Sequence, residues 1–158
     1  MPIHDLVIDE RTRARGSEAQ QADWEATGRE VREAADRIIE YDASLEISVT
    51  EQSFLIRAVS PAQELLYERA VHHDTLAATV NEYVDIVRQI ANAEGLNQME
   101  ALDMAKKVTH DRAARVLKKE LRDFGFDHET CRKLFTFLLS LRVDTTRISG
   151  INSHRPMR

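Results

Sequence analysis

The sequence contains little cysteine, little glycine and no long hydrophobic run, and each shortage excludes a class of protein. The one cysteine, Cys131, cannot form a disulfide within the chain, which indicates a reducing compartment. No apolar run approaches the roughly 18 residues of a membrane span, and the first residues lack the pattern of a signal peptide. The five glycines stand singly, so they form no phosphate-binding loop. We therefore expect a cytoplasmic protein without a membrane segment.

Lysine is absent from the first 100 residues, and this absence reveals an uneven distribution of charge. The whole chain has a net charge of −5. Residues 1–100 contain 9 Arg and 20 acidic residues, which gives −11, whereas residues 101–158 contain 13 basic and 7 acidic residues, which gives +6. With 158 residues, 42 % of them hydrophobic, the chain is long enough for one domain with its own core.

The N-terminal part of the chain predicts a short strand and one amphipathic helix. Residues 3–8 alternate imperfectly between apolar and polar types, which favours a strand. Residues 11–16 are basic, contain no apolar residue larger than alanine, and should be mobile. From Ser17 or Asp23 to about Tyr41, apolar residues recur at helical spacing opposite a face of alternating charges.

The pattern then changes to that of strands. Residues 45–49 alternate strictly and residues 54–59 form a second strand-like run, so the polar segment between them predicts a β-hairpin. Residues 64–72 fit either a helix or a third strand. We favour a strand, because a two-stranded hairpin alone is only marginally stable.

The C-terminal part predicts three helices, each preceded by a residue type that caps helix N-termini. They run from Asp74 to Gly95, from about Gln98 to Phe124 after an Asn97–Glu100 capping box, and from Glu129 to Arg142 after Asp127. The predicted fold is therefore α+β: a small antiparallel sheet, either a hairpin or a three-stranded meander, packed by an N-terminal helix and three C-terminal helices. Residues 1–143 form the single domain, and residues 144–158 form a flexible basic tail.

Two segments carry a resemblance to a known family. Residues 99–104, Met-Glu-Ala-Leu-Asp-Met, are followed by Lys106, Lys107 and His110, and a Leu-Phe-Thr helix follows at 134–136. This arrangement resembles an uncharacterised alphaproteobacterial family of small soluble proteins. The resemblance implies an α+β fold and brings no activity or cofactor with it. The two lysines stand where the family has arginines, and lysine cannot reproduce the bidentate geometry of a guanidinium group.

One helix face carries the best candidates for chemistry. Glu100, Asp103, Lys107 and His110 have offsets of 0, 3, 7 and 10 residues, so they share one face of the predicted helix. Glu100, Asp103 and His110 could bind a divalent metal, or act as acid and base on a substrate. Lys107 would repel a cation, however, and an ordinary solvated face with an Asp103–Lys107 pair explains the same pattern. We favour the solvated face.

Two smaller groups are weaker candidates. His72, His73 and Asp74 could supply one metal ligand, but a strand end running into a helix cap explains them better. Cys131 lies near a helix N-terminus three residues after His128, which can favour a thiolate. Because Cys131 also continues an apolar stripe, we interpret it as a buried core residue.

The predicted helix 98–124 also carries a strongly basic set, consisting of Lys106, Lys107, Arg112, Arg115, Lys118, Lys119 and Arg122. Such a surface could neutralise phosphates, but the chain as a whole is acidic and no aromatic residues alternate with the bases. We expect instead that the acidic first helix and hairpin neutralise it, within one chain or across a symmetric dimer.

The sequence contains no complete catalytic set, which favours a non-enzymatic binding or regulatory module acting through protein–protein contacts, without a cofactor. The partner would be a second copy of the chain or another protein. The alternatives are a nucleic-acid-binding protein that uses the basic helix and a metal-dependent enzyme that uses Glu100, Asp103 and His110.

Overall fold

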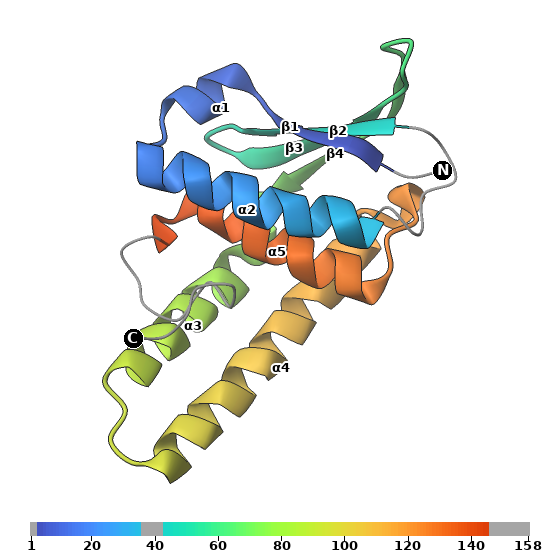
Figure 1. The fold of residues 1–158 in the computed structure, drawn as a ribbon. Helices are drawn as coiled ribbons and strands as arrows, with labels where there is room; N and C mark the ends of the chain where they lie inside the picture. Colours follow the sequence, from blue (N-terminus) through green and yellow to red (C-terminus); the bar gives the residue numbers. More distant parts are fainter. Residues whose placement is uncertain (1–2, 36–42, 146–158) are drawn as a thin grey trace.

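The computed structural model describes residues 3–35 and 43–145, which form strands, helices and one 3₁₀ turn (Figure 1). In chain order the elements are β1 (Ile3–Ile8), α1 (Glu10–Ala14), α2 (Glu18–Ala35), β2 (Ala43–Val49), β3 (Ser53–Val59), β4 (Leu65–His72), α3 (His73–Ala91), α4 (Leu96–Glu120), η1 (Arg122–Phe124) and α5 (His128–Arg142). The predicted α+β class is confirmed, and so is the strand at residues 3–8, which is β1. The expected extension of the first helix to Tyr41 falls on residues 36–42, which lie outside the described part.

The four strands form one mixed sheet in the order β1-β2-β3-β4. Strands β2, β3 and β4 are antiparallel neighbours, which confirms the hairpin and the preference for a strand over residues 64–72. The purely antiparallel sheet of two or three strands is wrong, because β1 adds a fourth strand that runs parallel to β2. Parallel neighbours need a long crossover connection, and α1 and α2 lie in that connection.

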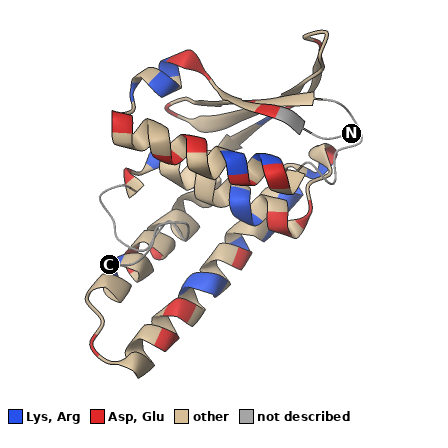
Figure 2. Ribbon diagram, viewed as in Figure 1, with Lys and Arg blue, Asp and Glu red and all other residues tan. Residues whose placement is uncertain are grey.

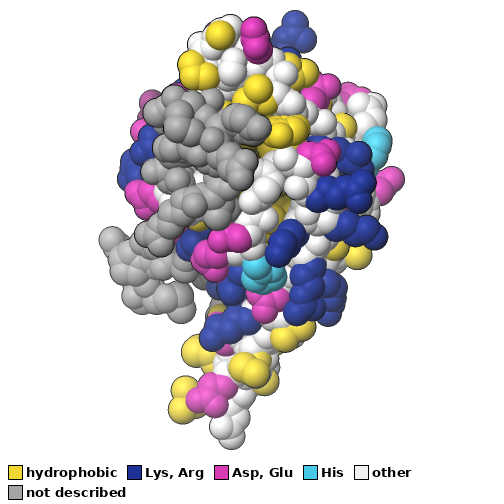
Figure 3. Space-filling model, turned by 90° about the vertical axis from the view of Figure 1, so that its right-hand side faces the viewer, with side chains coloured by type: hydrophobic (Ala, Val, Ile, Leu, Met, Phe, Trp, Pro, Cys, Tyr) yellow, Lys and Arg dark blue, Asp and Glu magenta, His cyan; other side chains and the backbone are white. Residues whose placement is uncertain are grey.

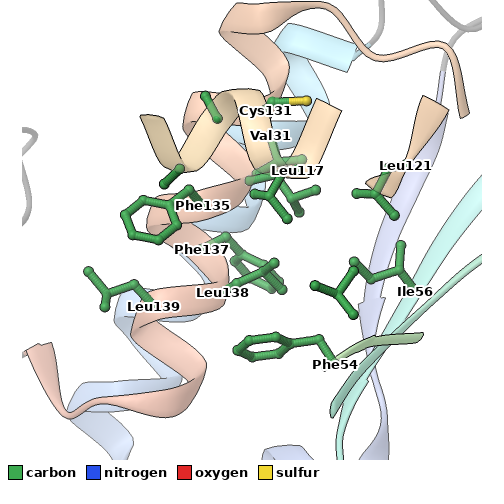
Figure 4. Close-up of a cluster of buried hydrophobic side chains, with 14 of the residues drawn as sticks. Val31, Phe54, Ile56, Leu117, Leu121, Cys131, Phe135, Phe137, Leu138 and Leu139 are labelled. Atoms are coloured by element: carbon green, nitrogen blue, oxygen red, sulfur yellow. The ribbon is translucent and has the colours of Figure 1, made fainter. Parts of the chain in front are cut away.

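The helices cover one face of this sheet (Figure 1). Strand β2 turns Leu45 and Ile47 inward and β3 turns Phe54 and Ile56 inward, all of them buried. Helix α5 lies against both α2 and α4, and its apolar side chains fill the space beneath the sheet (Figure 4). The labelled side chains there come from α2, α4, α5 and β3 and from Leu121, which directly follows α4. Burial of this cluster is the main force that holds the layers together.

Helices α3 and α4 pack against each other as an antiparallel pair that projects from the rest of the fold (Figure 1). The predicted cap at Asp127 is confirmed, since its carboxylate accepts a hydrogen bond from the Thr130 N–H at 2.8 Å. The caps predicted for the other two helices are wrong. Helix α3 begins one residue earlier, at His73, and α4 begins at Leu96 directly after Gly95, whose φ of 89° suits glycine.

The segments expected to be mobile make specific contacts where the structure describes them. Within residues 11–16, Thr12 of α1 is buried, and its hydroxyl accepts a hydrogen bond from the Val49 N–H at 3.1 Å. At the start of the expected tail, the buried Thr145 hydroxyl donates to the Asp23 carboxylate at 2.7 Å. Residues 146–158 of that tail lie outside the described residues, and mobility itself stays a prediction.

Candidate functional site

Helix α4 carries most of the residues that the sequence singled out, and its neighbours divide them into separate groups. His110 is half-buried between α3 and α5, whereas Glu100 and Asp103 are exposed nearer the projecting end. Asp103 and Lys107 form the expected i,i+4 ion pair at 3.7 Å. Among residues 3–35 and 43–145, no three His, Cys, Asp or Glu side chains converge as a metal site would require. The structure therefore does not assemble Glu100, Asp103 and His110 into a metal centre.

A hollow of about 260 Å³ opens beside α4 where it faces α5, and we call it the α4–α5 hollow. Four residues of α4 that were candidates from the sequence line it: Asp103, Lys106, Lys107 and His110. Glu100, which was also a candidate, does not line it. The other lining residues come from α2, α3 and α5. The full lining is Glu30, Tyr83, Asp103, Lys106, Lys107, His110, Glu129, Arg132, Lys133 and Thr136. Sequence reasoning missed the residues contributed by α2, α3 and α5, because helical spacing relates only positions on one helix.

His110 is the most constrained polar group of this hollow. Its Nε2 lies 2.8 Å from the Arg132 carbonyl oxygen and 3.1 Å from the Thr136 hydroxyl oxygen. A carbonyl oxygen can only accept, so Nε2 carries the proton and Nδ1 is the acceptor nitrogen of the neutral ring. The ring also packs against those of Tyr83 and Phe135, with centroids 5.6 Å away in each case, and these two rings contact each other at 5.7 Å.

Burial shifts the protonation equilibria in the α4–α5 hollow toward neutral side chains. Desolvation lowers the pKa of His110 to about 4, and the nearby Arg132 and Lys106 charges act in the same direction. Desolvation also lowers the pKa of Lys106, whose Nζ lies 5.9 Å from the centroid of the Tyr83 ring. The pKa of Tyr83 is raised to about 12, mainly by burial. At neutral pH, His110 is therefore uncharged and too weakly basic to act as an efficient general base.

The basic residues of α4 divide into those that form an ion pair with an acidic side chain and those that do not. Arg112 pairs with Glu82 of α3 at 2.8 Å, and Lys133 of α5 pairs with Glu30 of α2 at 3.7 Å. Within the described residues Arg112 is therefore neutralised by α3, whereas the expected acidic partners of this helix were the first helix and the hairpin, and Glu30 of the first helix pairs with α5 instead. Four basic residues of α4 and η1 form no ion pair with another described residue: Arg115, Lys118, Lys119 and Arg122. Figure 2 shows acidic positions near the projecting end of α4 and basic positions beyond them.

The projecting end of the α3–α4 pair carries exposed hydrophobic side chains. Seven large hydrophobic residues are exposed in the described part of the chain, and four of them lie on α4: Leu96, Met99, Met104 and Val108. Leu96 is 71 % exposed and Met104 is 64 % exposed. In Figure 3 hydrophobic side chains gather at the lower end of the molecule, below a group of Lys and Arg side chains. Leu96, Met104 and Val108 lie toward one side of the helix, and we call the surface that they form the α4 apolar surface.

The two weaker candidate groups have structural roles. The His73 ring contacts the Phe54 ring edge-on, and its Nε2 lies 2.8 Å from the Thr50 carbonyl oxygen, so it joins α3 to the β2–β3 turn. Cys131 is fully buried, and desolvation raises the pKa of its thiol to about 12. The interpretation of Cys131 as a core residue is confirmed. His128 instead lies 3.2 Å from a carboxylate oxygen of Asp111.

Comparison with known proteins identifies a family and no activity. A model described as an uncharacterised protein family (UPF0262) matches residues 2–144, nearly the whole chain, which agrees with the resemblance in segments 99–110 and 134–136. No curated protein and no solved structure matches the chain. None of the helices in the described residues combines the length and the apolar composition that a membrane span needs.

Proposed function

The chain belongs to the uncharacterised protein family UPF0262, and because that description carries no activity, we propose from its own surface that it is a non-enzymatic binding or regulatory module acting through protein–protein contacts. The observation that carries the proposal is the α4 apolar surface. Scattered exposed hydrophobic residues are ordinary, but a group of them on one projecting element marks an interaction site.

The partner that fits this surface best is a second copy of the chain. Glu100, Met104 and Arg115 lie on one side of α4, because offsets of 4 and 15 residues are close to one and four helical turns. If two α4 helices pack antiparallel across a two-fold axis near Val108, Glu100 of each copy lies opposite Arg115 of the other. Met104 and Val108 then lie between these pairs. The arrangement covers Met104 and Val108 and joins opposite charges at its rim; in the same register Met104 lies opposite Asp111 and Val108 opposite Lys107.

The test measures the oligomeric state by sedimentation equilibrium. The unmodified chain should form a dimer, and Met104→Glu should convert it to a monomer, because a carboxylate would then be buried near the axis. Leu65→Glu is the matched control: Leu65 is also an exposed hydrophobic residue, 48 % accessible, but it lies on β4. A monomer at every concentration, or a dimer that Met104→Glu leaves intact, would overturn self-association.

A charge-swap experiment distinguishes a second copy from any other partner. Glu100→Lys and Arg115→Glu should each weaken the homodimer, because each substitution places like charges opposite one another. An equimolar mixture of the two variants should instead form heterodimers. In the mixed pair the introduced lysine faces the introduced glutamate, and the native Arg115 of one chain faces the native Glu100 of the other, so both contacts join opposite charges. A mixture that stays monomeric would contradict the antiparallel register.

Nucleic acid is the alternative partner, and the four basic residues that form no ion pair with a described residue favour it. Arg115, Lys118, Lys119 and Arg122 would each neutralise phosphates, so binding should weaken steeply as salt rises. Replacing Lys118 and Lys119 with glutamine should then lower the affinity for any nucleic-acid sequence alike. The measurement is fluorescence anisotropy with labelled DNA and RNA at low salt, and undetectable binding excludes this alternative.

A further inference from the structure

A second hollow, of about 410 Å³, lies between strand β1 and helix α2, on elements that the proposed dimer does not use. Its lining includes the apolar side chains of Leu6, Ile8 and Trp24, together with Gly28. Strand β1 is the edge strand of the sheet, so no further described strand covers this side. Charged and polar side chains complete the lining, and a concave site of this size with apolar and polar groups together is typical of sites for small molecules. We call it the β1–α2 hollow.

The close approach of α2 to its neighbours shapes the floor of this hollow. A Cβ atom on Gly28 would lie 3.3 Å from the Leu6 Cδ2 atom and 3.2 Å from a ring carbon of Phe137. Glycine at this position therefore lets α2 pack against β1 and α5 with little space between them. The indole N–H of Trp24 donates to the Ser140 carbonyl oxygen at 2.8 Å, which fixes the indole ring in the floor. The apolar floor is thus rigid rather than adaptable.

Three arginines line the same hollow: Arg13 from α1, and Arg29 and Arg32 one turn apart on α2. Figure 2 shows basic positions on both helices. None of the three guanidinium groups forms an ion pair with a residue in the described ranges. The lining also contains the carboxylates of Asp5 and Glu25: that of Asp5 accepts a hydrogen bond from the Leu6 N–H at 2.9 Å, and that of the exposed Glu25 forms no ion pair with these arginines. The hollow therefore presents guanidinium donors that lack a described anionic partner above an apolar floor.

We propose that the β1–α2 hollow binds a small organic anion, with its carboxylate or phosphate group held by Arg13, Arg29 and Arg32 and its apolar body placed on Leu6 and Ile8, above the buried Trp24. Guanidinium groups match the planar, two-oxygen geometry of carboxylates and phosphates. Apolar contact with the floor would supply the remaining binding energy. This proposal goes beyond the proposed protein–protein function and does not depend on it.

The sole tryptophan of the chain, Trp24, provides the measurement. Octanoate, octyl phosphate and octanol share one apolar body and differ in the head group, so they serve as probes below their micelle-forming concentrations. Octanoate or octyl phosphate should change the Trp24 fluorescence saturably, and the tighter of the two identifies the preferred anion. Octanol should bind at least about tenfold more weakly, since it offers the arginines no charge.

Variants then connect the signal to the arginines. The double variant Arg29→Gln and Arg32→Gln should lower the affinity for the preferred anion by about tenfold or more. Arg88→Gln, which replaces an exposed arginine on α3, is the matched control and should leave the affinity unchanged. All these positions are exposed, and circular dichroism checks that each variant is folded. Absence of saturable binding, equal binding of octanol, or an unchanged affinity in the double variant would each overturn the proposal.

Discussion

Acidification should destabilise the fold through His110, and the size of the effect follows from its surroundings. Burial against Tyr83 and Phe135 lowers the pKa of His110 to about 4, whereas an unfolded chain has the usual value near 6.5. Between these two values the unfolded chain binds a proton that the folded chain does not. The free energy of unfolding therefore falls as the pH falls through this window, and His110 leaves it unaffected above the window.

The magnitude comes from the difference between the two pKa values. Each pKa unit corresponds to about 1.4 kcal/mol, so lowering the pH from 7 to 4 should cost about 3 kcal/mol through His110 alone. Such a loss is a large fraction of the total stability of a typical domain, which is about 5–15 kcal/mol. Carboxylates also take up protons as the solution becomes acidic, and the hydrogen bond from the Thr130 N–H lowers the pKa of Asp127, so the contribution of His110 has to be isolated with a variant.

The assay is urea unfolding at several pH values between 4 and 7. His110→Gln keeps an N–H donor for the Arg132 carbonyl oxygen but cannot be protonated, so its stability should fall by about 3 kcal/mol less over this range. His72→Gln, which removes an exposed histidine, should keep the pH dependence of the unmodified chain. If His110→Gln has the same pH dependence as the unmodified chain, or if an NMR titration places the His110 midpoint near 6.5, the reasoning fails.

Two further predictions concern helix α5. Asp127→Ala should lower the free energy of unfolding by about 1 kcal/mol, because the Thr130 N–H loses its acceptor. Asp127→Asn should retain most of the stability, because its amide oxygen can still accept this hydrogen bond. Urea unfolding at pH 7 measures both variants. The thiol of Cys131 should react with an aromatic disulfide reagent only as fast as the chain unfolds, because it is buried and its pKa is raised to about 12. Rapid labelling of the folded protein would contradict this prediction.

Patterns among neighbouring residues predict most helices and strands of this chain, but they do not predict how strand β1 pairs in the sheet. The alternation in residues 45–49 and 54–59 and the cap at Asp127 are both determined by neighbouring residues, and the structure contains both. The parallel pairing of β1 with β2 joins strands separated by two helices, and nothing in either strand encodes that partner. The sequence misplaces the start of α4 because Asn97 and Glu100 imitate a capping box, whereas the positive φ of Gly95 lies in the residue before the helix.

The sequence predicts the part of the candidate site that lies on α4, and it does not predict the part that other helices contribute. Helical spacing correctly places Asp103, Lys107 and His110 near one another, and all three line the α4–α5 hollow. Spacing cannot reveal that Arg132 and Thr136 approach from α5, and the Arg132 carbonyl oxygen determines which nitrogen of His110 is protonated. Burial of a histidine depends on what packs across it, and that information lies in the tertiary structure.

The length of α4 determines which charges can meet within one chain. Arg112 reaches Glu82 because α3 packs alongside α4 at that level. Glu100 and Arg115 are separated by 15 residues of continuous helix, or about 22 Å at 1.5 Å per residue, so they cannot pair within one molecule. A second α4 running in the opposite direction removes this separation, because the acidic end of one helix then lies beside the basic part of the other. An ion pair between Glu100 and Arg115 can therefore form only between two molecules, as the proposed dimer requires.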